Sequence, residues 1–194
     1  MNRLFDISFT LLISPLIILV TFISAIFVIV ESKTFPFYMQ KRVGKKRKVF
    51  KIVKIKTMKD NFDFQSYLDS NPDKKKEWRE YQKLKDDIRI TKVGKFLRKI
   101  SIDKFPQFLN ILKGDMTLIG PRPITTDQID LYPYDDYYSV LPGITGLWQT
   151  EIRNGSDFLT RAKYDRIYIQ SKCFLLDMKI FFKTFFVILS AKGS

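Results

Sequence analysis

A long uncharged apolar segment near the N-terminus constrains this chain more than any other feature of its sequence. From Ile7 to Val30 the chain carries no charged residue, and most of its side chains are apolar. A helix needs about 20 mostly apolar residues to cross the hydrocarbon layer of a bilayer, and this segment is long enough. A cleaved signal peptide fits poorly, because no small-residue cleavage pattern precedes the basic residues that follow. The sequence therefore predicts a membrane anchor over residues 1–32.

Ser14-Pro15 interrupts this segment and leaves two arrangements open. Proline kinks or breaks a helix, and a neighbouring serine can satisfy the carbonyl that proline leaves without a donor. The anchor is then either one straight or mildly kinked span, or a bent helix that enters the membrane and returns to the same face. Arg3 precedes the segment and many basic residues follow it, and cationic segments prefer the cytoplasmic side. The charge pattern favours the second arrangement, a re-entrant helix broken at Ser14-Pro15.

Composition limits the chemistry that the rest of the chain can perform. The chain has 34 Lys and Arg against 20 Asp and Glu, a net charge of +14, no His and one Cys. The charge predicts an anionic partner, which is a nucleic acid, an anionic membrane surface or a phosphorylated substrate. The absence of His excludes Ser-His and Cys-His dyads and His-containing metal sites. The single thiol of Cys173 excludes an internal disulfide and fits a reducing compartment.

Residues 33–194 read as one cytoplasmic domain that is mainly α with little β. Asn71-Pro72 predicts a helix start, and apolar spacing over 91–112 predicts two amphipathic helices interrupted near Ser101 and Pro106. Residues 49–56 read as a short extended or helical piece, while 114–123 and 141–146 read as Gly/Pro-rich loops. The aromatic run 174–189 predicts a helix in the membrane interface or, alternatively, a buried core helix. The expected fold is a re-entrant helix plus a small domain with interfacial amphipathic helices.

Several segments carry the candidate chemistry. Taken singly they have ordinary explanations, since an arginine between prolines often marks a rigid solvent loop and an aspartate at a helix start is often a cap. Their order and spacing, however, closely resemble the bacterial sugar transferase family, the monotopic phosphoglycosyl transferases, over nearly the whole chain. The segments are Gln40–Gly44, Phe50–Met58, Asp87–Gly94, Leu97–Gln107, Asn110–Pro123 and Leu141–Gln149.

The resemblance implies an activity that composition does not show. Family members transfer a sugar phosphate from a nucleoside diphosphate sugar to polyprenyl phosphate and release the nucleoside monophosphate, which begins the assembly of a surface glycan. They use Mg²⁺ and a covalent phosphosugar intermediate on an aspartate, which Asp103 matches here as nucleophile and metal-binding residue. The implied location is the cytoplasmic face of the bacterial cytoplasmic membrane. The implied partners are a nucleotide sugar, which by resemblance carries uridine, polyprenyl phosphate and membrane lipids.

Other candidate site residues surround Asp103 in this interpretation. Arg122, held between Pro121 and Pro123, suits bidentate contact with phosphate oxygens. Arg98 precedes Asp103 by five residues, so both side chains share a pocket if the intervening turn is irregular. By resemblance, Asp165 matches an acidic position near the substrate.

Lys104 departs from the family pattern, because the family's nucleophile is normally followed by glutamate. A charged lysine cannot ligate Mg²⁺. Lys104 either keeps Asp103 ionised and supplies a fixed positive charge, or it removes metal binding and leaves a weakly active or inactive member with a scaffolding role. A smaller departure is Ile152, where family members usually carry glycine.

A nucleic-acid binder is not expected, because much of the basic charge adjoins the anchor and no nucleic-acid-binding motif is present. Between residues 31 and 60 there are eleven Lys or Arg and two acids. A homo-oligomer is compatible with the sequence, and no motif identifies the sugar.

Overall fold

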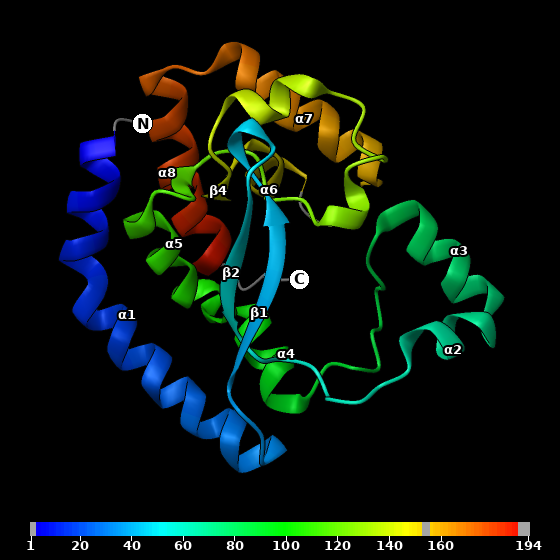
Figure 1. Ribbon diagram of the computed structural model, residues 1–194. Helices are drawn as coiled ribbons and strands as arrows, with labels where there is room; N and C mark the ends of the chain where they lie inside the picture. Colours follow the sequence, from blue (N-terminus) through cyan, green and yellow to red (C-terminus); the bar gives the residue numbers. More distant parts are fainter. Residues whose placement is uncertain (1–2, 153–155, 190–194) are drawn as a thin grey trace.

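The computed structural model describes residues 3–152 and 156–189, most of which are helical (Figure 1). The helices are α1 (Arg3–Ser32), α2 (Phe64–Asp69), α3 (Pro72–Tyr81), α4 (Lys92–Lys99), α5 (Phe108–Lys113), α6 (Leu147–Glu151), α7 (Phe158–Ser171) and α8 (Phe174–Leu189). The strands are β1 (Phe37–Val43), β2 (Val49–Ile55), β3 (Thr117–Ile119) and β4 (Gly143–Thr145). Short 3₁₀ segments are η1 (Lys45–Arg47), η2 (Ile102–Gln107), η3 (Thr126–Gln128) and η4 (Asp135–Ser139). The prediction of a mainly helical chain with little β structure is confirmed.

Helix α1 runs without interruption through Pro15. The helix is therefore continuous at Ser14-Pro15, where a break was expected. Proline has no N–H to donate to the carbonyl of Leu11, four residues earlier. The Ser14 hydroxyl donates to that carbonyl oxygen at 2.8 Å instead, as the sequence predicted. The helix therefore accommodates the proline, and it is bowed along the side of the molecule (Figure 1).

One side of α1 packs on the domain and the other is exposed. Its N-terminal part places Phe9 against Phe181 of α8, with ring centroids 5.0 Å apart, and its C-terminal part buries Val28 beside Ile55 and Leu97. The opposite face leaves large apolar side chains uncovered, among them Leu12, which is 78% exposed. The helix is long and apolar enough to cross a membrane by length and composition. Whether it crosses or re-enters stays a prediction.

Strands β1 and β2 form a long antiparallel hairpin whose register pairs Phe37 with Ile55 and Val43 with Val49. The extended reading of residues 49–56 is thereby confirmed. Phe50 and Ile52 are buried in the main apolar cluster, together with residues of β3, α5, α7 and α8. The hairpin therefore has one part fixed in the core, while its other end extends toward α4 and the C-terminal part of α1 (Figure 1).

Strands β3 and β4 correct the expectation that residues 114–123 and 141–146 are loops. They form a short parallel pair in which Thr117 is opposite Gly143 and Ile119 opposite Thr145. Glycine permits the pairing, because a Cβ on Gly143 would lie 2.1 Å from the nitrogen of Gly120. The glycines that suggested loops are therefore present because two backbones approach closely.

Helix α8 combines the two roles considered for the run 174–189. Ile180 and Asp177 are fully buried on its inner side. Phe174, Leu175 and Phe186 are exposed on another side. The helix is thus a core element with an uncovered apolar face, and contact of that face with lipid stays a prediction. The free thiol of Cys173 is exposed just before α8.

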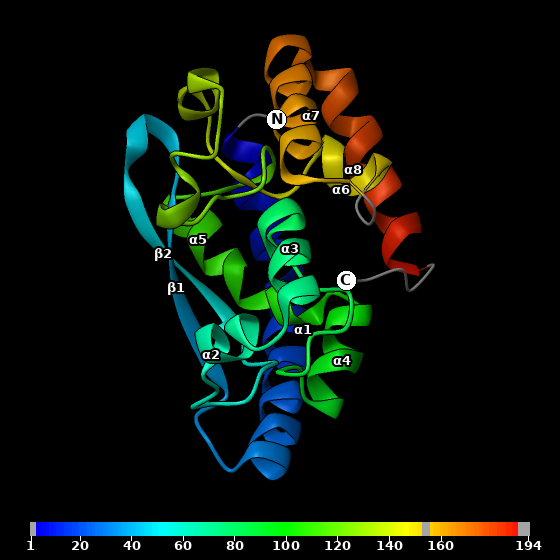
Figure 2. The same ribbon diagram turned by 90° about the vertical axis from the view of Figure 1, so that its right-hand side faces the viewer.

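Helices α2 and α3 form an excursion that projects from one side of the molecule, to the right in Figure 1 and toward the viewer in Figure 2. Asn71 precedes Pro72 at the first position of α3, as the sequence predicted. The guanidinium carbon of Arg89 lies 3.6 Å from the centroid of the Phe64 ring, and its Nε donates to Asp87 at 2.8 Å. A cation–π contact backed by an ion pair thus holds α2 to the chain segment that leads into α4.

Candidate active site

A cavity of about 640 Å³ lies between the hairpin, η2, the loop after β3, the start of α7 and the α2–α3 excursion. Its lining brings together distant parts of the chain. Predicted site residues on its wall are Arg98, Asp103, Lys104 and Arg122. These four, which the sequence placed at one site, therefore face the same space.

Asp103 is held in place by an abrupt change of backbone direction. Helix α4 ends at Lys99, and Ser101 takes a left-handed conformation with φ of 62° before η2 begins at Ile102. This is the irregular turn that a shared pocket for Arg98 and Asp103 requires. Asp103 is 6% exposed, and one of its carboxylate oxygens accepts from Lys104 Nζ at 3.1 Å. A buried carboxylate with a cationic neighbour is the central group of the site.

Arg98 approaches the cavity from the last turn of α4. Its Nε donates to the Thr57 hydroxyl at 2.9 Å, which fixes the guanidinium against the end of the hairpin. Burial lowers the pKa of Arg98, while the carboxylates of Asp103 and Asp87 oppose that shift. Arg98 therefore presents a fixed positive charge near Asp103.

The loop that carries Arg122 is fastened through its own carbonyl oxygens. Pro121 O accepts from Gly143 N at 2.8 Å, and Pro123 O accepts from Arg42 Nη1 at 2.9 Å. The oxygen of Arg122 accepts from Arg161 Nη2 at 2.9 Å. Pro121 and Pro123 are buried and do not line the cavity. They stiffen the loop, and the side chain of Arg122 faces the cavity.

Asp165 lies under this loop, outside the cavity lining. It is 1% exposed, accepts from the Tyr132 hydroxyl at 3.1 Å, and lies 3.7 Å from Arg161 Nε. Burial raises its pKa to about 6, against the attraction of Arg161 and hydrogen bonds from Tyr132 and the Arg122 backbone. In this geometry Asp165 supports the loop from below, and direct contact with substrate stays a prediction.

Two cationic residues of the hairpin were missed by the sequence analysis. Lys54 and Arg42 both line the cavity. Burial lowers the pKa of Lys54 well below its ordinary value, and the charges of Arg42 and Arg122 add to that shift. Burial also lowers the pKa of Arg42 to about 10. Alternation along a strand places Gln40 and Arg42 on one face, but the hairpin register is needed to show that Lys54 shares that face.

The fit of Mg²⁺ to this site depends on its carboxylates. No group of three or more His, Cys, Asp or Glu residues that could hold a metal occurs among the residues described here. Asp103 supplies one carboxylate, and Lys104 occupies one of its oxygens. Mg²⁺ often binds through one or two carboxylates with substrate phosphates and water. Asp103 therefore suits an ion that arrives with a diphosphate.

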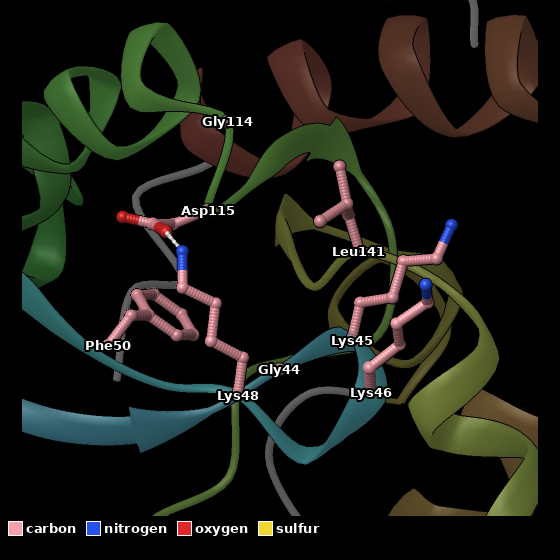
Figure 3. Close-up of a pocket in the computed structure, with 8 residues that line it drawn as sticks. All are labelled: Gly44, Lys45, Lys46, Lys48, Phe50, Gly114, Asp115 and Leu141. Carbon is pink, nitrogen blue, oxygen red and sulfur yellow. Dashed lines mark hydrogen bonds and ion pairs between the residues drawn. The ribbon is translucent and has the colours of Figure 1, made fainter.

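A second cavity of about 350 Å³ lies at the tip of the hairpin and shares no lining residue with the first. Figure 3 shows Asp115 and Lys48 pointing toward each other, with Lys45 and Lys46 turned away. Lys48 Nζ and Asp115 Oδ1 are 3.0 Å apart. Asp115, part of the Gly114-Asp115-Met116 motif, therefore contacts the hairpin tip and lies outside the cavity that holds Asp103. Ile152 directly follows α6, and the three residues after it lie outside the described part of the chain.

Comparison with known proteins gives matches over most of the sequence. The chain is 42% identical to the exopolysaccharide production protein ExoY of Sinorhizobium fredii over 162 residues, 81% of this chain and 72% of that protein. It is 43% identical over 161 residues to the undecaprenyl-phosphate galactose phosphotransferase of Salmonella typhimurium, covering 81% of this chain and 34% of that protein. It is 35% identical to the uncharacterized sugar transferase EpsL of Bacillus subtilis over 198 residues, 100% of this chain and 89% of that protein.

The chain thus corresponds to most of some relatives and to about a third of others. Residues 1–191 match the model of one family, described as bacterial sugar transferase. The match includes the apolar helix α1, the hairpin and the cavity with Asp103. The chain belongs to the bacterial sugar transferase family.

Proposed function

We propose that this protein transfers a sugar 1-phosphate from a nucleoside diphosphate sugar, with uridine as the nucleoside, to polyprenyl phosphate. The observation that carries the proposal is the buried carboxylate of Asp103 in a cavity lined by Arg98, Arg122, Lys54 and Arg42. Such a cavity suits a diphosphate, because fixed cations offset the charge of substrate and nucleophile. Relatives named undecaprenyl-phosphate galactose phosphotransferase and UDP-glucose:undecaprenyl-phosphate glucose-1-phosphate transferase support it.

In the first step a carboxylate oxygen of Asp103 attacks the phosphorus that bears the sugar. A bond forms between that oxygen and phosphorus, and the phosphorus–oxygen bond to the nucleoside monophosphate breaks, so UMP leaves with the electron pair. Covalent catalysis of this kind divides one displacement into two. Arg122 and Lys54 stabilise the charge on the phosphate oxygens, and Arg98 stands beside the carboxylate.

In the second step an oxygen of polyprenyl phosphate attacks the same phosphorus. The bond to Asp103 breaks, which regenerates the carboxylate and yields a polyprenyl diphosphate sugar. This product is the lipid-linked starting unit of a surface glycan such as a capsule, exopolysaccharide, O-antigen or glycoprotein. The acceptor is a lipid, so the reaction requires a membrane-bound enzyme, with α1 in the cytoplasmic membrane and the cavity on its cytoplasmic side.

Mg²⁺ bound by the diphosphate and Asp103 would supply further charge neutralisation during the displacement. Lys104 competes for the same carboxylate, with its Nζ 3.1 Å from Oδ1. If this competition excludes Mg²⁺, the alternative is a weakly active or inactive member that acts as a scaffold. Position 104 therefore decides between an enzyme that uses a fixed cation and one that has lost turnover.

The test measures UMP release by the purified protein in lipid nanodiscs with undecaprenyl phosphate, Mg²⁺ and a panel of UDP-sugars. We expect release with at least one sugar and its loss in Asp103→Asn. Asp115→Asn is the matched control, because Asp115 belongs to a neighbouring motif but lies outside the cavity. With the acceptor omitted, labelled sugar phosphate should remain on the wild-type protein and not on Asp103→Asn.

Lys104→Glu separates the enzyme from the scaffold. Equal or lower turnover in Lys104→Glu than in the wild type would show that Lys104 serves the reaction. A large gain from a nearly silent wild type would support the scaffold. Absence of UMP release with every sugar in both proteins would refute the proposed transfer.

A further inference from the structure

Helix α1 carries a buried carboxylate within its otherwise apolar N-terminal half. Asp6 is 2% exposed. An acidic side chain is costly in an apolar segment unless it has partners. Asp6 has two, both from β3: its Oδ2 accepts from the Thr117 hydroxyl at 2.7 Å, and its Oδ1 accepts from Leu118 N at 3.1 Å. The carboxylate therefore joins the anchor helix to one short strand.

The geometry of β3 explains why a helix supplies this acceptor. On one edge β3 pairs with β4, where Thr117 N donates to Pro142 O at 2.9 Å and Gly120 N to Thr145 O at 2.9 Å. The N–H of Leu118, between these residues, points to the opposite edge, where no strand follows among the described residues. A buried N–H left without an acceptor is costly. Asp6 thus completes the hydrogen bonding of β3.

A second polar contact holds the end of β3 from the other side. The hydroxyl of Tyr168 lies 3.2 Å from Ile119 O and 2.7 Å from Asp177 Oδ1. Tyr168 belongs to α7 and Asp177 to α8, and both are buried in or beside the main apolar cluster. Polar groups of α1 and α7 therefore contact three residues of one strand, and Asp177 of α8 holds the Tyr168 hydroxyl.

The same strand leads directly into the loop Gly120–Pro123, which presents Arg122 to the cavity. Two prolines stiffen this loop, so a displacement of β3 is passed to Arg122. We infer that Asp6 is a positioning residue, through which the seating of the anchor helix sets the place of the Arg122 loop in the active site. This inference rests on the proposed function for its kinetic consequence, and on the hydrogen bonds alone for its structural one.

The kinetic test compares three variants in nanodiscs. Asp6→Leu keeps the number and branching of the side-chain heavy atoms and removes both acceptors, so we expect kcat to fall by about 10- to 100-fold, as for a misplaced catalytic group, with the KM for the nucleotide sugar changed less than threefold. Asp6→Asn should restore most of kcat, because its oxygen accepts from Leu118 N and its amide donates to the Thr117 hydroxyl. Thr21→Val is the control, since the buried Thr21 hydroxyl of the same helix has no hydrogen-bond partner among the described residues.

Hydrogen–deuterium exchange gives a readout that does not require activity. In Asp6→Leu the amides of residues 118–124 should exchange faster, while peptides of α2 and α3 keep the wild-type rate. Thr117→Val combined with Asp6→Leu should slow the reaction less than the product of the two single effects, because both substitutions remove the same hydrogen bond between Thr117 and Asp6.

Two results would overturn the inference. One is an Asp6→Leu protein with wild-type kcat, and the other is faster exchange confined to α1. If the wild type releases no UMP, the proposed function fails, and the exchange measurement still decides the role of Asp6.

Discussion

Lys54 is a residue of the candidate site whose protonated form is disfavoured in the free protein. Burial and the neighbouring Arg42 and Arg122 favour its neutral form, which lowers its pKa well below the ordinary value. A bound diphosphate replaces that repulsion by attraction and favours the protonated form. Substrate binding and protonation of Lys54 are therefore linked.

We expect nucleotide binding to be accompanied by proton uptake at Lys54 at a pH below the ordinary pKa of lysine, because a lowered pKa leaves part of the free protein unprotonated there. Titration calorimetry of UMP or a UDP-sugar in buffers of different ionisation enthalpy measures this uptake. Lys54→Met should abolish it and weaken binding. Lys51→Met, at an exposed position of the same strand, should bind as the wild type does. Equal uptake in wild type and Lys54→Met would exclude Lys54 as the source.

Asp165 predicts a pH dependence of stability. Its pKa is raised to about 6 by burial, so between its unfolded pKa and pH 6 the folded state binds more protons than the unfolded state. Its contribution to stability is fully present below about pH 4 and is lost as the pH rises through 6, with an upper bound of about 3 kcal/mol.

Asp165→Asn removes that titration. Thermal unfolding of both proteins in detergent from pH 4 to 7 should show the wild type losing stability relative to the variant as the pH rises. Asp127→Asn, at an exposed position, should follow the wild type. A constant difference between wild type and Asp165→Asn over this range would contradict the raised pKa.

At the scale of elements, the sequence predicted what local chemistry encodes. Asn71-Pro72 begins α3, and the apolar spacing of residues 91–112 gave two helices separated near Ser101. Strands β3 and β4 were missed because their glycines allow two distant backbone segments to approach closely. In the sequence alone, such glycines look like those of a loop. The same is true of part of the candidate site. Its lining residues Arg98, Asp103, Lys104 and Arg122 lie in motifs that can be recognised in the sequence.

The remaining site residues depend on tertiary structure. Lys54 and Arg42 were hidden in a basic segment whose net charge suggested a membrane surface, and only the hairpin register shows which side chains turn inward. Asp6 lies just outside the uncharged segment, and its role depends on the neighbouring strand.

Gly94 gives a prediction about how α4 is placed. A Cβ at this position would lie 2.2 Å from the backbone oxygen of Thr57, so Gly94→Ala must separate α4 from the end of the hairpin. Thr57 also accepts the hydrogen bond of Arg98. We expect a loss of stability of about 1–3 kcal/mol and a lower kcat, measured by thermal unfolding and UMP release. Lys95→Ala, exposed on the same helix, should change neither, and a stable Gly94→Ala protein would refute the close packing.

At the scale of the whole molecule, α1 and α8 both expose large apolar side chains, as surfaces that contact a membrane or a partner do. Two topologies for α1 predict different accessibility of its ends. In a Cys173→Ser background, single cysteines at Leu4 and Lys33 report both ends to a membrane-impermeant maleimide. A re-entrant helix makes both react from the cytoplasmic side of inverted vesicles, and we expect this result. Reaction of one end from each side would establish a spanning helix. Ser139→Cys, in the domain, controls vesicle orientation.

The β1–β2 hairpin also limits which changes of chain length the molecule accepts. Side chains alternate along a strand, so one inserted or deleted residue between Val49 and Lys54 would turn Lys54 to the other face and shift Thr57 away from Arg98. The tip at 45–47 touches no part of the active-site cavity. Insertions and deletions among related chains should therefore accumulate at the tip, while the length of each strand stays constant.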